Sequence, residues 1–123
     1  MIVPQVISSL TPGQILFGSP NGQFTTTSET DAQVPAPRAG TITGLSARLV
    51  SSLSGASSII ASFRVNGVDV VTLTFTAADA GGTIKSAVAS APVALGDLLS
   101  SRWENPAGMP TGTVIFSTTV DFA

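Results

Sequence analysis

The chain has 123 residues, a net charge of −2 and 10% charged residues, and it contains no histidine and no cysteine. This length accommodates one compact domain. Without His and Cys, histidine-based catalytic triads, thiol chemistry, disulfides and the common zinc sites are excluded. A slightly acidic chain also does not suit a nucleic-acid binder, which neutralises phosphates with Lys and Arg. We therefore expect a structural or binding protein, with no enzymatic activity, cofactor or metal.

The composition favours strands over helices. Val, Ile and Thr are abundant, whereas Lys and Glu, which typically cover exposed helix faces, are scarce. Turn residues recur at short intervals along the chain, which has 12 Gly and 8 Pro. Many short strands between frequent turns are typical of a sandwich or barrel. We predict a single all-β domain over residues 1–123, with about eight to ten antiparallel strands and no helix.

Residues 1–13 have two interpretations, a first strand or a docking arm. An arm would add a strand to the sheet edge of a neighbouring subunit, with apolar contacts from Ile2, Val3, Val6, Ile7 and Leu10. The segment has no basic residue and contains Pro4, so it does not resemble a secretory signal. No stretch reaches the ~18 apolar residues of a membrane helix. We expect synthesis in the cytoplasm and no membrane contact.

The next segment alternates short strands with turns. Gln14–Phe17 is predicted to be a strand, and Asn21–Gly22 is a hairpin signal. The returning strand is Gln23–Thr27, and residues 28–37 are expected to be irregular. Glu29 and Asp31 lie in this polar stretch, where a solvated loop is favoured over an acid/base pair.

The most regular pattern lies between residues 41 and 76. Thr41–Leu53 alternates as a long strand, and a change of phase predicts a bulge near Gly44. Ser58–Val65 alternates with its apolar residues inward, and Val68–Thr76 does the same. Asn66–Gly67 between them is a strong two-residue hairpin signal.

Three further strands are predicted in the last third of the chain. Thr83–Val93 is the weakest pattern, and a turn at Leu95-Gly96-Asp97 leads into Leu98–Glu104. Asp97 is a turn aspartate or a calcium ligand, and the turn is favoured because Ca²⁺ needs six to eight oxygens. Thr113–Phe122 closes the chain.

The segment from residue 39 onward contains a series of motifs whose order and spacing are characteristic when taken together. The motifs are Ala39-Gly-Thr-Ile-Thr43, Phe63-Arg-Val-Asn-Gly67, Thr72-Leu-Thr-Phe75, Ala94-Leu-Gly-Asp-Leu98 and the strand ending in Phe122. They are similar to tumour-necrosis-factor and complement globular-head domains, and closer to versions found in bacteriophage particles and bacterial spore-surface filaments. The aromatic content is low and Tyr is absent, which favours the phage branch. The resemblance implies a jelly-roll β-sandwich and a homotrimer.

The same resemblance implies a function. Phage proteins of this size and fold are often decoration, or cement, proteins, so we expect a trimer on the outer capsid surface of a virion that bridges subunits of the major capsid protein. The alternative is the receptor-binding tip of a phage fibre, and only this alternative implies a glycan ligand.

Four side chains outside the first segment are candidates for docking a partner. Arg48, Arg64 and Arg102 lie in outward phase on predicted strands and could pair with acidic groups of another subunit, or be ordinary surface arginines. Trp103 could form a flat platform for a sugar, or be a core or interface residue. Val50 and Ile60 are apolar in outward phase, which is typical of an interface or of isolated surface residues.

Overall fold

The structure is a computed structural model that describes residues 2–7, 15–18, 25–49, 58–76, 78–105 and 116–123. It confirms the all-β prediction, because the described part consists mostly of strands in antiparallel sheets. The strands are β1 (Ile2–Ile7), β2 (Ile15–Gly18), β3 (Thr25–Thr26), β4 (Val34–Pro35), β5 (Gly40–Leu49), β6 (Ser58–Val65), β7 (Val68–Thr76), β8 (Ile84–Val93), β9 (Leu98–Glu104) and β10 (Phe116–Phe122).

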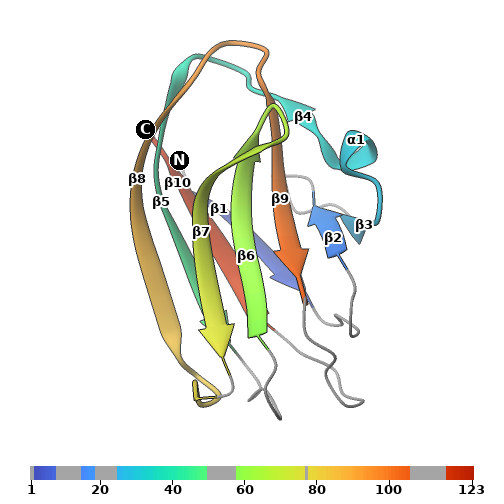
Figure 1. The fold of residues 1–123 in the computed structure, drawn as a ribbon. Helices are drawn as coiled ribbons and strands as arrows, with labels where there is room; N and C mark the ends of the chain where they lie inside the picture. Colours follow the sequence, from blue (N-terminus) through green and yellow to red (C-terminus); the bar gives the residue numbers. More distant parts are fainter. Residues whose placement is uncertain (1, 8–14, 19–24, 50–57, 77, 106–115) are drawn as a thin grey trace.

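Two sheets make up a sandwich-like fold (Figure 1). The four-stranded sheet has the order β1-β10-β5-β8, and the six-stranded sheet has the order β3-β2-β9-β6-β7, with β4 paired to β9. All of these pairs are antiparallel. In Figure 1 the six-stranded sheet lies in front of the four-stranded one.

One hydrophobic cluster fills the space between the sheets. The four-stranded sheet contributes Leu45 and Leu49, and the six-stranded sheet contributes Phe63 and Phe75. The predicted alternation is confirmed, since these side chains are all buried. A polar exception is Asn105, just after β9, whose buried side-chain amide has no hydrogen-bond partner.

Trp103 belongs to the same core and is 1% exposed. Of the two interpretations of Trp103, the structure has the core residue, so the ring offers no platform to a sugar and no surface for docking a partner. The reason is its phase on β9, because Arg102 and Glu104 point outward while Trp103 points between the sheets. The indole ring is the largest side chain of this chain, so placing it between the sheets buries more apolar surface than any other residue would.

The first segment forms a strand of its own molecule. β1 pairs antiparallel with β10 over its whole length, from Ile2 opposite Asp121 to Ile7 opposite Phe116. Two interpretations were given for residues 1–13, a first strand and a docking arm. Over Ile2–Ile7 the structure shows the first strand. Leu10 lies outside the described residues, as do Val50 and the Asn21–Gly22 signal.

A short helix, α1 (Glu29–Ala32), lies where an irregular segment was expected. The prediction of no helix was wrong at this point. Four residues are too few to produce a helical period in the sequence, so the pattern gave no signal. Ala32 is fully buried, and the Gln33 N–H donates to the Glu29 carbonyl at 3.0 Å. The helix thus holds Glu29 beside the six-stranded sheet.

Two local predictions are confirmed. The register of β5 shifts between Ile42 and Gly44, which is the expected bulge. Asn66 and Gly67 have φ of 50° and 78°, so both adopt the left-handed conformation of a two-residue hairpin turn. This turn reverses the chain between β6 and β7.

Gly40 is required by close packing at the start of β5. A Cβ at this position would lie 2.5 Å from Cζ of Phe122 and 2.7 Å from the carbonyl oxygen of Ala123. We expect Gly40→Ala to lower the free energy of unfolding by about 2 kcal/mol, because the ring and the backbone must move apart. Urea denaturation measures this loss.

Gly44→Ala is the matched control on the same strand. Its Cβ would meet only the Ala87 carbonyl oxygen, at 3.2 Å, so we expect a smaller loss. Equal stability of the Gly40→Ala variant and the native chain would contradict the close approach.

Candidate functional site

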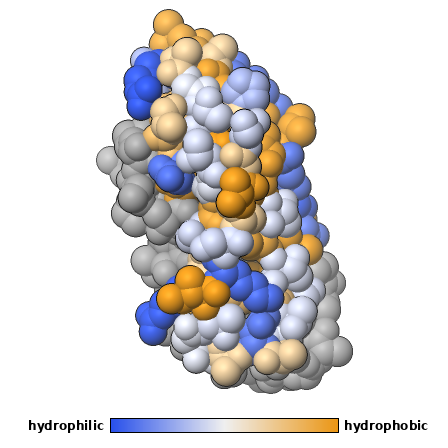
Figure 2. All heavy atoms as spheres, turned by 90° about the vertical axis from the view of Figure 1, so that its left-hand side faces the viewer, coloured by the Kyte–Doolittle hydropathy of each residue, from blue (hydrophilic) through white to orange (hydrophobic). Residues whose placement is uncertain are grey.

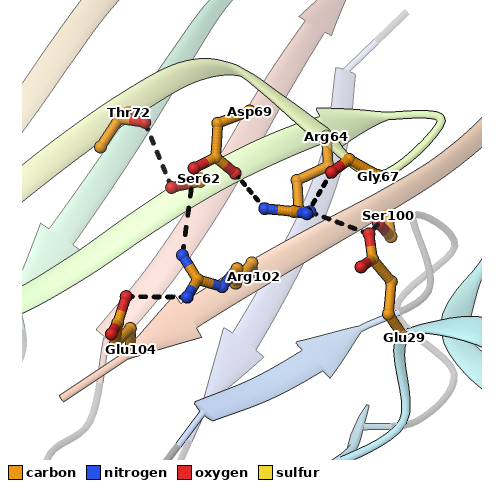
Figure 3. Close-up of polar contacts among 9 residues, drawn as sticks. All are labelled: Glu29, Ser62, Arg64, Gly67, Asp69, Thr72, Ser100, Arg102 and Glu104. Carbon is orange, nitrogen blue, oxygen red and sulfur yellow. Dashed lines mark hydrogen bonds and ion pairs between the residues drawn. The ribbon is translucent and has the colours of Figure 1, made fainter. Parts of the chain in front are cut away.

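Arg64 is the centre of a polar network on the outer face of the six-stranded sheet (Figure 3). Its Nε lies 2.8 Å from Glu29 Oε1, and its Nη1 lies 2.6 Å from Asp69 Oδ1. Its Nη2 donates to the carbonyl oxygen of Gly67. Ser100 Oγ donates to the same Glu29 oxygen at 3.1 Å. One guanidinium therefore joins α1, β6 and β7, and the Glu29 oxygen that it shares with Ser100 adds β9.

Arg102 extends this network along β9. Its Nη2 lies 2.9 Å from Glu104 Oε2, and its Nη1 lies 3.9 Å from Asp69 Oδ2. Burial alone would lower the pKa of Arg64. The hydrogen bonds with Glu29 and Asp69 raise this pKa by more than burial lowers it, so the pKa of Arg64 lies above its ordinary value. The Arg64 guanidinium is therefore permanently charged, and both arginines are paired with acids of their own chain.

The structure thus separates the three candidate arginines. Arg64 and Arg102 are neighbours on one sheet, on adjacent strands β6 and β9. Arg48 lies on β5 in the other sheet, where it is exposed and stands opposite Ile84 of β8. Only Arg48 keeps an exposed position suited to pairing with another subunit.

A second cluster joins two turns at one end of the molecule. Asn66 Nδ2 donates to Asp97 Oδ1 at 3.1 Å, and the Leu98 N–H donates to Asn66 Oδ1 at 2.9 Å. The Asn66 N–H donates to the Leu98 carbonyl at 2.7 Å. We call this set of contacts between the β6–β7 turn and the β8–β9 turn the Asn66–Asp97 clamp.

Asp97 has the role of the predicted turn aspartate. Its Oδ2 accepts the Ala94 N–H at 2.8 Å, across a turn in which Gly96 has a φ of 86°. The hydrogen bond from the Ala94 N–H, followed by that from the Asn66 amide, lowers the pKa of Asp97. Among the residues that the structure describes, no three metal-ligating side chains are grouped.

The large apolar side chains that are exposed in the described part lie on β8 and at the clamped end. Val88 is 93% exposed and Ile84 is 68% exposed, both on the outer face of β8. Figure 2, which views the side of β8, shows separated apolar patches among weakly polar and strongly hydrophilic residues. Leu95, Leu98 and Val68 surround the clamp, and Leu95 is 71% exposed. Apolar side chains on β8 and near the two clamped turns thus face solvent.

Comparisons with known proteins add no family to this description: neither the scan against family models nor the search of curated proteins found a match. Within the described ranges, no helix is long and apolar enough to cross a membrane.

The sequence pattern did not predict the partners of these groups. Glu29 was placed in a solvated loop, yet it is 35 residues from Arg64 in sequence and bonded to it. The Asn66–Gly67 and Gly96-Asp97 motifs were each identified as turns, but their contact spans 31 residues. Periodicity reports local structure only, so such pairings had no signal.

Replacing Arg64 should destabilise the fold even when the charge is kept. We expect both Arg64→Met and Arg64→Lys to lower the free energy of unfolding by about 2 kcal/mol, because a single ammonium cannot reach all three acceptors. Chemical denaturation of both variants measures the effect.

Arg48→Met is the control for the loss of one cation, and we expect a change within about 0.5 kcal/mol. If Arg64→Lys were as stable as the native chain, the three hydrogen bonds of the Arg64 guanidinium would contribute nothing to the free energy of unfolding.

Asp97 should make stability depend on acidic pH. Its folded pKa is lowered, so the stabilisation is complete above the ordinary value of 3.8 and is lost as pH falls through the folded pKa. We expect the native chain to be more stable than Asp97→Asn at neutral pH, and the difference to shrink below about pH 4.

Unfolding curves at a series of pH values measure this difference. Asp31→Asn is the control, since Asp31 is an exposed carboxylate that takes no part in the clamp. A difference between Asp97→Asn and the native chain that does not change with pH would rule out the titration of Asp97 as its source.

Proposed function

We propose that the chain is a jelly-roll structural protein that forms homotrimers and decorates the outer surface of a phage capsid. The pairing of its strands is the observation that carries this proposal. β1 pairs with β10, β2 with β9, β5 with β8 and β6 with β7. The two-residue strands β3 and β4 lie outside this scheme, since they pair with β2 and β9. Among the other eight strands the first meets the last, the second meets the second-last, and so on inward. This is the wrapping of one long hairpin into two sheets, which supports the jelly roll that the motifs resemble.

The distribution of charge supports a role in assembly. Arg64 and Arg102 are occupied by acids of their own chain, so the outer face of β6 and β9 has little left to offer a partner. The outer face of β5 and β8 carries Ser46 and Ser86, hydrogen-bonded to each other at 2.9 Å, with Val88 and Ile84 beside them. We place the contact between copies on this second face, because covering it desolvates few ions.

The mechanism is mechanical. A trimer that touches several coat subunits must lose all of those contacts before the subunits separate. Linking the contacts raises the overall avidity by ~10²–10⁴ over one contact alone. Capsid stabilisation therefore requires no catalytic group and no tight individual contact.

The fibre-tip alternative receives less support. Glycan platforms use an exposed aromatic face, and Trp103, the only tryptophan of the chain, is buried. No described feature favours the tip over decoration.

The oligomeric state of the purified protein is the direct test. We expect light scattering to give the mass of a trimer, and Val88→Asp to give folded monomers, which unfold at a lower temperature than the trimer because they lack the stabilisation by assembly. Thr74→Asp, on the exposed face of β7, is the control and should remain trimeric. A native monomer would overturn the trimer, and a trimeric Val88→Asp variant would overturn the contact on β8.

Copy number tests the location. In particles that contain the protein, mass spectrometry should give a near-stoichiometric ratio to the major coat protein. A few copies per particle would favour the fibre tip, and absence from particles would contradict both.

A further inference from the structure

We propose that Asn66 is a self-modification site, at which loss of its side-chain amide permanently opens the Asn66–Asp97 clamp. This inference does not depend on the proposed capsid function. It rests on the Asn-Gly dipeptide, on the exposure of Asn66 and on what the Asn66 amide touches. Glycine after asparagine leaves the following backbone nitrogen unhindered, because it has no Cβ.

The chemistry needs only water. The backbone nitrogen of Gly67 attacks Cγ of Asn66 and forms a five-membered succinimide, while the bond from Cγ to Nδ2 breaks. The proton of the Gly67 N–H leaves with the amide nitrogen as ammonia. Water then opens the ring at either carbonyl, which gives aspartate or isoaspartate. No oxidant, metal or second protein is required.

The folded turn restrains this reaction. The Leu98 N–H holds Asn66 Oδ1 at 2.9 Å, and Asp97 Oδ1 accepts from Nδ2 at 3.1 Å. Arg64 donates to the Gly67 carbonyl, which fixes the peptide on the other side. Cγ and the Gly67 nitrogen must rearrange before they can react, so these bonds have to open first. The modification therefore follows local opening of the turn.

The product cannot re-form the bond to Asp97 that the Asn66 amide made. A carboxylate at residue 66 has no N–H to donate, so its oxygen would face the Asp97 carboxylate at hydrogen-bond distance, with repulsion in place of the bond. The other charged groups around the turn are Arg64, Glu29 and Asp69. Arg64 is already bonded to both of these acids. Glu29 is also close to the turn, because a Cβ on Gly67 would lie 4.0 Å from Glu29 Oε1. Among the described residues around the turn, no free cation is available to offset the new charge.

A double-mutant cycle tests the consequence. Asn66→Asp reproduces the aspartate product, and we expect its folding equilibrium constant at neutral pH to be about tenfold lower than that of the native chain. In Asn66→Asp with Asp97→Asn, the new amide at 97 can donate to the carboxylate at 66, so most of the loss should be recovered. Asp97→Asn alone is the reference. A stable Asn66→Asp variant, or a double variant no better than the sum of its parts, would overturn the clamp argument.

Ageing of the native protein tests the chemistry. Peptide mapping should find aspartate and isoaspartate at residue 66 more slowly in folded protein than in urea at the same pH and temperature. The map must resolve residue 66 from Asn21, the other asparagine followed by glycine. The aspartate form, once separated from the isoaspartate form, should match Asn66→Asp in stability. Equal rates in folded and unfolded protein, or no product in either, would refute the site.

Discussion

The left-handed turn at Asn66–Gly67 is the constraint on which the arrangement of this molecule depends. Because both residues have positive φ, β6 and β7 pair without a longer loop, and the Gly67 carbonyl is presented to Arg64. The same turn aims the Asn66 amide at Asp97 on the other side. The ionic network and the clamp therefore share one two-residue turn. Strain at this turn would be transmitted to α1, to β9 and to the β8–β9 turn together.

Three of the four edge strands, β1, β7 and β8, are protected against pairing with other chains. Lys85 of the edge strand β8 donates to the carbonyl oxygen of Thr74 on the edge strand β7 at 2.8 Å and pairs with Asp79 at 3.0 Å. This closes the side where the two sheets meet. At the opposite side, β1 contains Pro4, which has no N–H to offer a further strand. Lysine and proline are common means of blunting an edge, so faces and turns are the surfaces available for assembly.

The sequence predicted local structure far better than it predicted contacts. Alternation located β6 and β7, the phase change located the bulge at Gly44, and Asn66–Gly67 located the hairpin, because each is encoded by adjacent residues. The inward phase of Trp103 on its strand indicated a core residue, but a surface role was kept as an alternative. The partners of Arg64 had no local signal, since Glu29 approaches through a helix too short to show a period. The network around Arg64 therefore becomes visible only when the fold brings residues together that are distant in sequence.

The two outer faces differ in what it costs to cover them. Burying the face of β6 and β9 would remove water from five charged groups whose geometry is satisfied within the chain, and a partner would need to replace every lost contact. Burying the face of β5 and β8 removes water from serine hydroxyls that already bond each other and from apolar side chains, which is favourable. Arg48 is the exception on that face. An acidic group of the partner opposite Arg48 would convert a desolvation penalty into a specific pairing, and it would fix the orientation of the two copies.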